Sequence, residues 1–251
     1  MYPILARLGP YFIYSYTVVM IMGVGAGLIL AFYLNSESKT KSLLWFDGLL
    51  VALVAAFLGG RIAYVWANWH YYQENVAEIG QVWQGGLSYH GALIAGLLTF
   101  WVWSLIRRNP FSYSLALLAP SLALASAFGW AACWLDGCAY GREAMPGLSS
   151  ALLPDEFGVM DLRYRTQLLG LIVSLLVLII ALMLWRRRQS KLLAWMTLLL
   201  LSIGRLFITL LRGDRIPMIN SIRIDTVAES LLIITCFIGL SVIIVNRKGN
   251  R

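Results

Sequence analysis

Long apolar stretches dominate the chain, and each is long enough to cross a lipid bilayer as a helix. Bilayer hydrocarbon is about 30 Å thick, so a helix that rises about 1.5 Å per residue needs about 20 residues to cross it. Unpaired backbone groups are costly in lipid, which favours helices in these stretches. The pattern predicts an all-α polytopic membrane protein, one integral membrane domain over residues 1–251, with seven transmembrane helices. We expect them at about 11–34, 46–68, 86–106, 112–132, 167–185, 192–211 and 227–245.

The composition excludes other classes of protein. Hydrophobic residues make up 60% of the 251 residues and charged residues only 13%, whereas soluble domains average about 25% charged residues. A chain of this length cannot bury so much apolar surface in one water-soluble core. A soluble enzyme, a disordered chain and a coiled coil are therefore excluded. Three cysteines are too few for a scaffold held together by disulfides.

Lysine and arginine are unevenly distributed between the two sets of connections. One set carries 11 basic residues and the other carries 7. Basic residues collect on the cytoplasmic side, so we expect the N-terminus outside and the C-terminus in the cytoplasm. The first stretch lacks a basic flank, and we expect it to remain a permanent span. The longer connections (69–85, 133–166 and 212–226) then lie outside, where chemistry is expected. The cytoplasmic basic residues are Lys39, Lys41, Arg107, Arg108, Arg186, Arg187, Arg188, Lys191, Arg247, Lys248 and Arg251.

Ionisable residues inside predicted spans are costly and are candidates for function. Arg61 follows a glycine pair, which would let another helix approach closely, although its side chain could instead reach the headgroups. His90 opens the third span between glycines and is a candidate base or orienting group, or a satisfied polar residue. No metal-ligand cluster accompanies it, so we expect no metal. Arg205 and Arg212 are seven residues apart, and we expect them on one helix face, where two guanidiniums suit a lipid phosphate.

Glycines, aromatic residues and two cysteines meet at the end of the fourth predicted span. Cys133 and Cys138 would form a disulfide in an oxidising compartment if their Cα atoms lie within about 7 Å. A thiol-redox role for these two cysteines is a competing hypothesis, although their spacing is not that of a CxxC motif. The aromatic residues there are also typical of a membrane interface, and they are Trp130, Trp134 and Tyr140.

Two motifs resemble the bacterial prolipoprotein diacylglyceryl transferases. They are Phe-Leu-Gly-Gly-Arg-Ile at 57–62 and Gly-Gly-Leu-Ser-Tyr-His-Gly at 85–91. Weaker matches follow in family order: Leu-Gly-Pro at 8–10 with Tyr16, residues 129–142, Arg163 with 166–168, and Gly204-Arg205 with Phe207 and Arg212. The expected seven spans and the outside N-terminus agree with this family.

The resemblance implies an enzyme of the bacterial plasma (inner) membrane. It would transfer diacylglyceryl from phosphatidylglycerol to the lipobox cysteine of a preprolipoprotein. We expect no cofactor, and no nucleic acid partner because the basic residues of a membrane protein set its topology. His90 would act as the base or orient the thiol, and Tyr16 and Arg205 would act with it. Phosphate and substrate would be bound by further residues of the motifs: Arg61, Arg142, Gly141, Arg212 and Gln167.

The resemblance is incomplete where the family signature lies. The signature is Gly-Arg-x-Gly-Asn-x-x-Asn-Gly-Glu-x-x-Gly, and this chain replaces its arginine, first asparagine and glutamate with Trp130, Cys133 and Cys138. Thr209 replaces a further glutamate, and Glu229 replaces a glutamine. Tryptophan cannot bind phosphate by charge. A divergent member with another acceptor therefore stays open, as does a non-enzymatic subunit of a membrane complex that binds lipid or protein.

Overall fold

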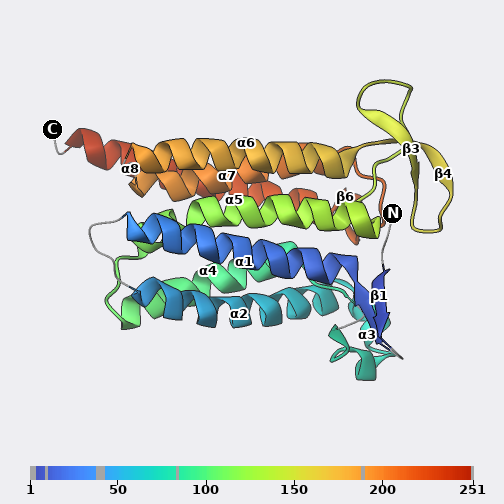
Figure 1. The fold of residues 1–251 in the computed structure, drawn as a ribbon, viewed down its shortest axis with the longest axis horizontal. Coiled ribbons are helices and arrows are strands. Elements are labelled where there is room, and N and C mark those ends of the chain that lie inside the picture. Colours follow the sequence, from blue (N-terminus) through green and yellow to red (C-terminus); the bar gives the residue numbers. More distant parts are fainter. Residues whose placement is uncertain (1–3, 9–10, 38–42, 83–84, 188–189, 250–251) are drawn as a thin grey trace. The chain divides into compact units, whose positions relative to one another are not determined.

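A computed structural model describes residues 4–8, 11–37, 43–82, 85–187 and 190–249 (Figure 1). Seven helices in this part of the chain are long and apolar enough to cross a membrane. They confirm the predicted all-α class with seven transmembrane helices, whereas the orientation of the termini stays a prediction. The seven are α1 (Ser15–Ser36), α2 (Leu44–Ala67), α4 (Tyr89–Ile106), α5 (Phe111–Asp136), α6 (Thr166–Arg186), α7 (Ser190–Thr209) and α8 (Ile224–Gly249), and the short helices α3 (Trp69–Tyr72) and η1 (Val76–Glu78) follow α2.

In the part of the chain that the structure describes, three pairs of antiparallel strands occupy segments that the hydropathy pattern did not identify as strands. The first predicted span began too early, because β1 (Ile4–Leu8) pairs antiparallel with β2 (Tyr11–Tyr14) before α1 begins. An apolar run of four residues continues the hydropathy of the span, so its end cannot be seen from composition alone. The other hairpins are β3 (Ser150–Pro154) with β4 (Met160–Tyr164) and β5 (Met218–Ile219) with β6 (Ile222–Arg223).

Some sequence predictions fall outside the described residues. Gly9 and Pro10 of the Leu-Gly-Pro motif are among them, and so are several basic residues that set the expected orientation. Those basic residues are Lys39, Lys41, Arg188 and Arg251.

The observed ends of two spans differ from those expected in ways that affect the candidate site. Helix α5 continues to Asp136, so Cys133 lies within its last turns. Helix α7 ends at Thr209, and Arg212 lies beyond it in an isolated β-bridge with Gly141. The expectation that Arg205 and Arg212 share one helix face is therefore wrong, because the helical periodicity on which it rests stops between them.

The chain divides into two compact units, and each is described by itself. The first unit comprises Met1–Lys39, Leu115–Ile216 and Ile224–Arg251, and the second comprises Thr40–Ser114 and Pro217–Arg223. The first unit thus holds α1, most of α5, and α6 to α8 with the β3–β4 hairpin. The second holds α2, α3 and α4.

Small side chains let the helices of the first unit approach closely. Such contacts are typical of membrane bundles, where close packing replaces the hydrophobic effect between helices. The Ser121 hydroxyl of α5 also donates to the carbonyl of Gly27 in α1 over 2.7 Å. Figure 1 shows β3 and β4 beyond the ends of α5 and α6, where the chain passes from one helix to the other. Buried residues at the contacts of α5, α6 and α7 include Ala116, Ala119, Ala181, Leu193 and Ala194.

In the second unit α2 packs against α4 through the two glycine-containing motifs. The amide of Ser88 donates to the carbonyl of Gly60 over 2.9 Å. The Ser88 hydroxyl accepts from the amide of Gly91 and caps the N-terminus of α4. The two motifs at 57–62 and 85–91 are therefore in direct contact.

Candidate active site

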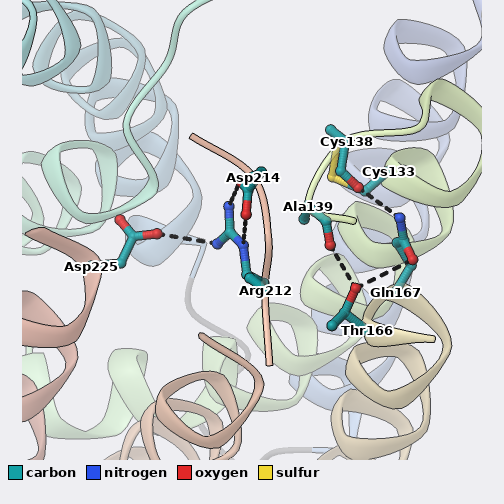
Figure 2. Close-up of a disulfide and its surroundings, with 8 residues drawn as sticks. All are labelled: Cys133, Cys138, Ala139, Thr166, Gln167, Arg212, Asp214 and Asp225. Atoms are coloured by element: carbon teal, nitrogen blue, oxygen red, sulfur yellow. Dashed lines mark hydrogen bonds and ion pairs between the residues drawn. A yellow bond between two sulfur atoms is a disulfide. The ribbon is translucent and has the colours of Figure 1, made fainter. Parts of the chain in front are cut away.

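A short loop closed by a disulfide follows α5 in the first unit (Figure 2). Cys133 and Cys138 are bonded, with their Cα atoms 4.8 Å apart. The loop turns at Gly137, where φ is +91°, and Ala139 also has a positive φ of +54°. A positive φ is unusual for alanine, so strong local contacts must hold this segment.

Two buried side chains at the start of α6 provide such contacts. The Thr166 hydroxyl donates to the carbonyl of Ala139 over 2.6 Å, and Gln167 Nε2 donates to the carbonyl of Cys138 over 2.9 Å. Both side chains are almost fully buried. Figure 2 shows them pointing from α6 toward the disulfide loop. Gln167, which the resemblance placed in substrate binding, here fixes the loop to α6.

The loop continues as a strand-like segment between two other stretches of backbone. The amide of Arg142 donates to the carbonyl of Leu211, and the carbonyl of Arg142 accepts from the amide of Tyr164. A Cβ atom at Gly141 would lie 2.2 Å from the carbonyl oxygen of Tyr164, so only glycine fits there. The Arg142 side chain is exposed and its guanidinium lies 5.9 Å from the centroid of the Tyr164 ring.

Arg212 is held by two carboxylates (Figure 2). Its Nε donates to Asp214 Oδ1 over 2.9 Å and its Nη2 donates to the other oxygen of the same carboxylate. Its Nη1 donates to Asp225 Oδ2 over 3.1 Å. A guanidinium in this two-pronged contact is a strong structural anchor. Sequence spacing did not indicate this pairing with the start of α8.

Arg205 lies within α7 and forms a buried charged contact with α8 in the first unit. Its Nε lies 2.9 Å from Oε1 of Glu229 in α8, which is 1% exposed. Its guanidinium also lies 5.6 Å from the centroid of the Trp130 ring in α5. Tyr16, in the first turn of α1, is within electrostatic reach of Arg205 and Asp136. Two of the expected catalytic residues, Tyr16 and Arg205, are thus brought together in this unit.

Trp130 is fixed by its own packing. Its ring lies in a small buried cluster with Ala139 and Ile208, and Cys133 packs against that cluster. The ring also covers Gly170 of α6, where an added Cβ would lie 2.2 Å from ring atoms. The residue that replaces the signature arginine is therefore an integral part of the helix packing.

Arg61 binds backbone carbonyls of the loop that leads to α4. Its Nε donates to the carbonyl of Ile79 over 2.9 Å, and its Nη2 donates to that of Glu78 over 2.7 Å. Its Nη1 donates to the carbonyls of Gly85 and Gly86 over 2.7 and 3.1 Å. Four of the five N–H donors of the guanidinium are thus used by the loop. The phosphate-binding role that the resemblance implied stays a prediction.

His90 is the second residue of α4 and lies in the second unit with Arg61. It is buried, and its ring meets that of Tyr89 edge to face with centroids 5.3 Å apart. Because Arg61 holds Gly85 and Gly86, it fixes the segment that leads into His90. Among the described residues, no group of three or more His, Cys, Asp or Glu could hold a metal ion.

Asp155 orders the turn of the β3–β4 hairpin. Its Oδ1 accepts from the amides of Phe157 and Val159, each over 2.9 Å, and its Oδ2 accepts from Arg163 over 3.2 Å. Burial acts to raise the pKa of this carboxyl, but the amide hydrogen bonds and Arg163 outweigh it and leave the pKa below its ordinary value. Nearby, burial raises the pKa of the Tyr140 hydroxyl, and the carboxylates around it add to the rise.

Sequence reasoning missed the ion partners of Arg205 and Arg212. Glu229 was noted only as a replacement within the family pattern, although a carboxylate within a predicted span signals a partner of opposite charge. Asp214 and Asp225 lie in the predicted connection 212–226, where the sequence offers no such signal.

Comparison with known proteins places the whole chain in one family. The family model described as prolipoprotein diacylglyceryl transferase matches residues 3–245. Two similar relatives, from Streptococcus pyogenes serotype M5 (strain Manfredo) and serotype M49 (strain NZ131), are named phosphatidylglycerol–prolipoprotein diacylglyceryl transferase. Each is 33% identical over 257 residues, which cover 98% of this chain and 95% of the relative.

Proposed function

Because the chain belongs to the prolipoprotein diacylglyceryl transferase family, we propose that it transfers diacylglyceryl from phosphatidylglycerol to the lipobox cysteine of a prolipoprotein. This extends to the chain what the names of its relatives say of them. We place it in the bacterial plasma membrane with the ends that carry Arg142 and Arg212 on the outer side, as the charge distribution predicts.

The reaction exchanges one bond for another at a single carbon. The cysteine sulfur attacks the carbon of the diacylglyceryl group that is bonded to a phosphate oxygen, a C–S bond forms, and the C–O bond of that carbon breaks. The bonding pair leaves with the phosphate oxygen, so the products are a thioether and glycerol phosphate. The thiol, with an ordinary pKa of about 8.5, must lose its proton to a base. A cation must stabilise the charge that develops on the leaving phosphate.

We propose that Arg205 is the cation that stabilises the leaving phosphate, and its geometry is the main support for the proposed function. It is an arginine within a membrane-spanning helix, held in one geometry by Glu229 and Trp130. A planar guanidinium binds phosphate oxygens in pairs, which suits the departing group. We assign a contact with the same headgroup to Tyr16, which lies within electrostatic reach of Arg205.

His90 is the proposed base or thiol-orienting group. Arg61 keeps the preceding loop in place, and with it the entry of His90 into α4. We assign to Gly141, Gln167 and Arg212 the shaping of the loop that borders the donor site, and to the exposed Arg142 a contact with the headgroup.

The test is product formation by purified protein in phosphatidylglycerol vesicles with a lipobox peptide, followed by mass spectrometry. The same peptide with serine in place of cysteine is the matched acceptor control, and phosphatidylcholine vesicles are the donor control. We expect a thioether product only with cysteine and phosphatidylglycerol. His90→Ala and Arg205→Ala should each reduce the rate at least tenfold, or about 1.4 kcal/mol of transition-state stabilisation.

Arg205→Lys should be nearly as harmful as Arg205→Ala, because an ammonium cannot reproduce a two-pronged contact. Full activity of both His90→Ala and Arg205→Ala would contradict the proposed mechanism. An inactive unmutated protein that still retains lipid would favour a non-enzymatic subunit of a membrane complex.

A further inference from the structure

Arg205 has two neighbours whose geometry gives them a role of their own. We propose that Glu229 and Trp130 are positioning residues that together fix the guanidinium of Arg205 for phosphate binding. This inference rests on the proposed function, since it assigns Arg205 to the donor phosphate. Neither neighbour needs to touch the substrate, because each acts on the arginine.

Glu229 fixes one edge of the guanidinium. Its Oε1 lies 2.9 Å from Arg205 Nε, and its side chain is 1% exposed while that of Arg205 is 18% exposed. The carboxylate therefore holds the arginine from the interior of the bundle. An arginine side chain has many rotamers, and holding it in one of them before substrate arrives avoids that ordering cost during the reaction.

Trp130 limits the tilt of the guanidinium plane. Its ring centroid lies 5.6 Å from Arg205 Cζ, within the range of a cation–π contact. The ring cannot yield easily, because it is 6% exposed and covers Gly170 at a distance that leaves no room for a Cβ. A hydrogen bond at one edge and an aromatic ring beside the group constrain both rotation and tilt.

The arrangement also explains how a tryptophan can stand at a position where the family signature has an arginine. An arginine at position 130 would contribute charge to the phosphate site, whereas the Trp130 ring contributes orientation to Arg205. Trp130 therefore serves Arg205 by alignment and not by added charge.

The test compares matched variants by kcat, by KM for phosphatidylglycerol and by thermal melting. Glu229→Ala and Trp130→Leu should lower kcat at least fivefold in protein that remains folded. Glu229→Gln keeps an oxygen that accepts from Nε, and it should recover kcat to within about threefold of the unmutated protein. Ser230→Ala, which removes a hydrogen bond made within α8, and Trp134→Leu, one turn further along α5, are the controls.

A second readout does not depend on activity. Phenylglyoxal modifies arginine, and mass spectrometry measures its rate at Arg205. We expect Glu229→Ala and Trp130→Leu to speed modification at least threefold, because the side chain is released, with no change in either control. Unchanged modification rates overturn the inference, whether or not the unmutated protein is active. Inactivity of the unmutated protein counts only against the proposed function. In active protein, an unchanged kcat in Glu229→Ala and Trp130→Leu, or equal losses in Glu229→Gln and Glu229→Ala, also overturns it.

Discussion

Replacement of Arg61 should disorder the loop that precedes His90. Its guanidinium donates four hydrogen bonds to the carbonyls of Glu78, Ile79, Gly85 and Gly86. Hydrogen bonds that involve a charged group contribute about 1.5–3 kcal/mol each, so four of them sum to about 6–12 kcal/mol. In Arg61→Met, water can replace about half of this hydrogen-bond free energy. The loop then loses about 3–6 kcal/mol of stability.

Hydrogen exchange measures this loss segment by segment. A loss of 3 kcal/mol corresponds to an increase in local opening of more than about 100-fold, so the peptide over 78–90 should exchange much faster in Arg61→Met. Arg61→Lys should give an intermediate effect, because three donors on a point charge cannot reach four carbonyls. The matched control is Arg107→Met, which removes an exposed arginine stacked on Trp103 in the same unit.

Two outcomes separate structural from direct action. If Arg61 acts through the loop, exchange at 78–90 and transferase activity change together. If exchange stays at the unmutated level while activity and phosphatidylglycerol binding are lost, Arg61 binds the donor directly and our reasoning about its carbonyl contacts is refuted.

Three further predictions concern the loop and hairpin of the first unit. Gly141→Ala should destabilise the protein by about 1–3 kcal/mol, since its Cβ would collide with the carbonyl of Tyr164, and a melting temperature equal to that of the unmutated protein would contradict this. Loss of the Cys133–Cys138 disulfide through paired serine substitutions should cost about 2 kcal/mol, as expected for a loop with a sequence separation of 5; thiols that alkylate in denatured, unreduced protein would show that the bond is absent. The pKa of Asp155 lies below its ordinary value of 3.8, so its contribution to hairpin stability is complete above that value and is lost as pH falls through the lowered pKa. Hydrogen exchange at 157–159 should therefore accelerate below pH 3.8, after correction for intrinsic rates, whereas Asp155→Asn should show no such step.

The membrane architecture could be predicted because each span carries its own signal. About 20 apolar residues in a row identify a helix in a membrane without any knowledge of its neighbours. The same local signal is ambiguous at the ends of spans. Tyr11–Tyr14 is apolar enough to continue α1 but pairs with β1 in a hairpin, and only that long-range pairing distinguishes the two structures.

The sequence indicated individual candidate residues of the site but not the contacts that they make. The cost of charge in a membrane identified Arg61 and Arg205, and the spacing of Cys133 and Cys138 allowed the bond that the structure contains. The partners of the two arginines depend on how distant segments pack. Glu229 follows Arg205 by 24 residues, and Arg61 lies 17 to 25 residues from its carbonyls.

Arg212 shows why a periodic pattern can mislead near a helix end. A separation of seven residues places two side chains on one face only while the helix continues. Helix α7 ends at Thr209, and the chain then pairs with Gly141. Asp214 and Asp225 could hold Arg212 only after that change of direction.

The most direct test of the proposed transfer is its stoichiometry. Purified protein in phosphatidylglycerol vesicles is given a lipobox peptide, and both the thioether-linked lipopeptide and the released glycerol phosphate are quantified over time. The mechanism predicts that one glycerol phosphate appears for each thioether formed, with neither product when serine replaces the acceptor cysteine. Release of glycerol phosphate without thioether, or the absence of both products from folded, lipid-bound protein, would contradict it.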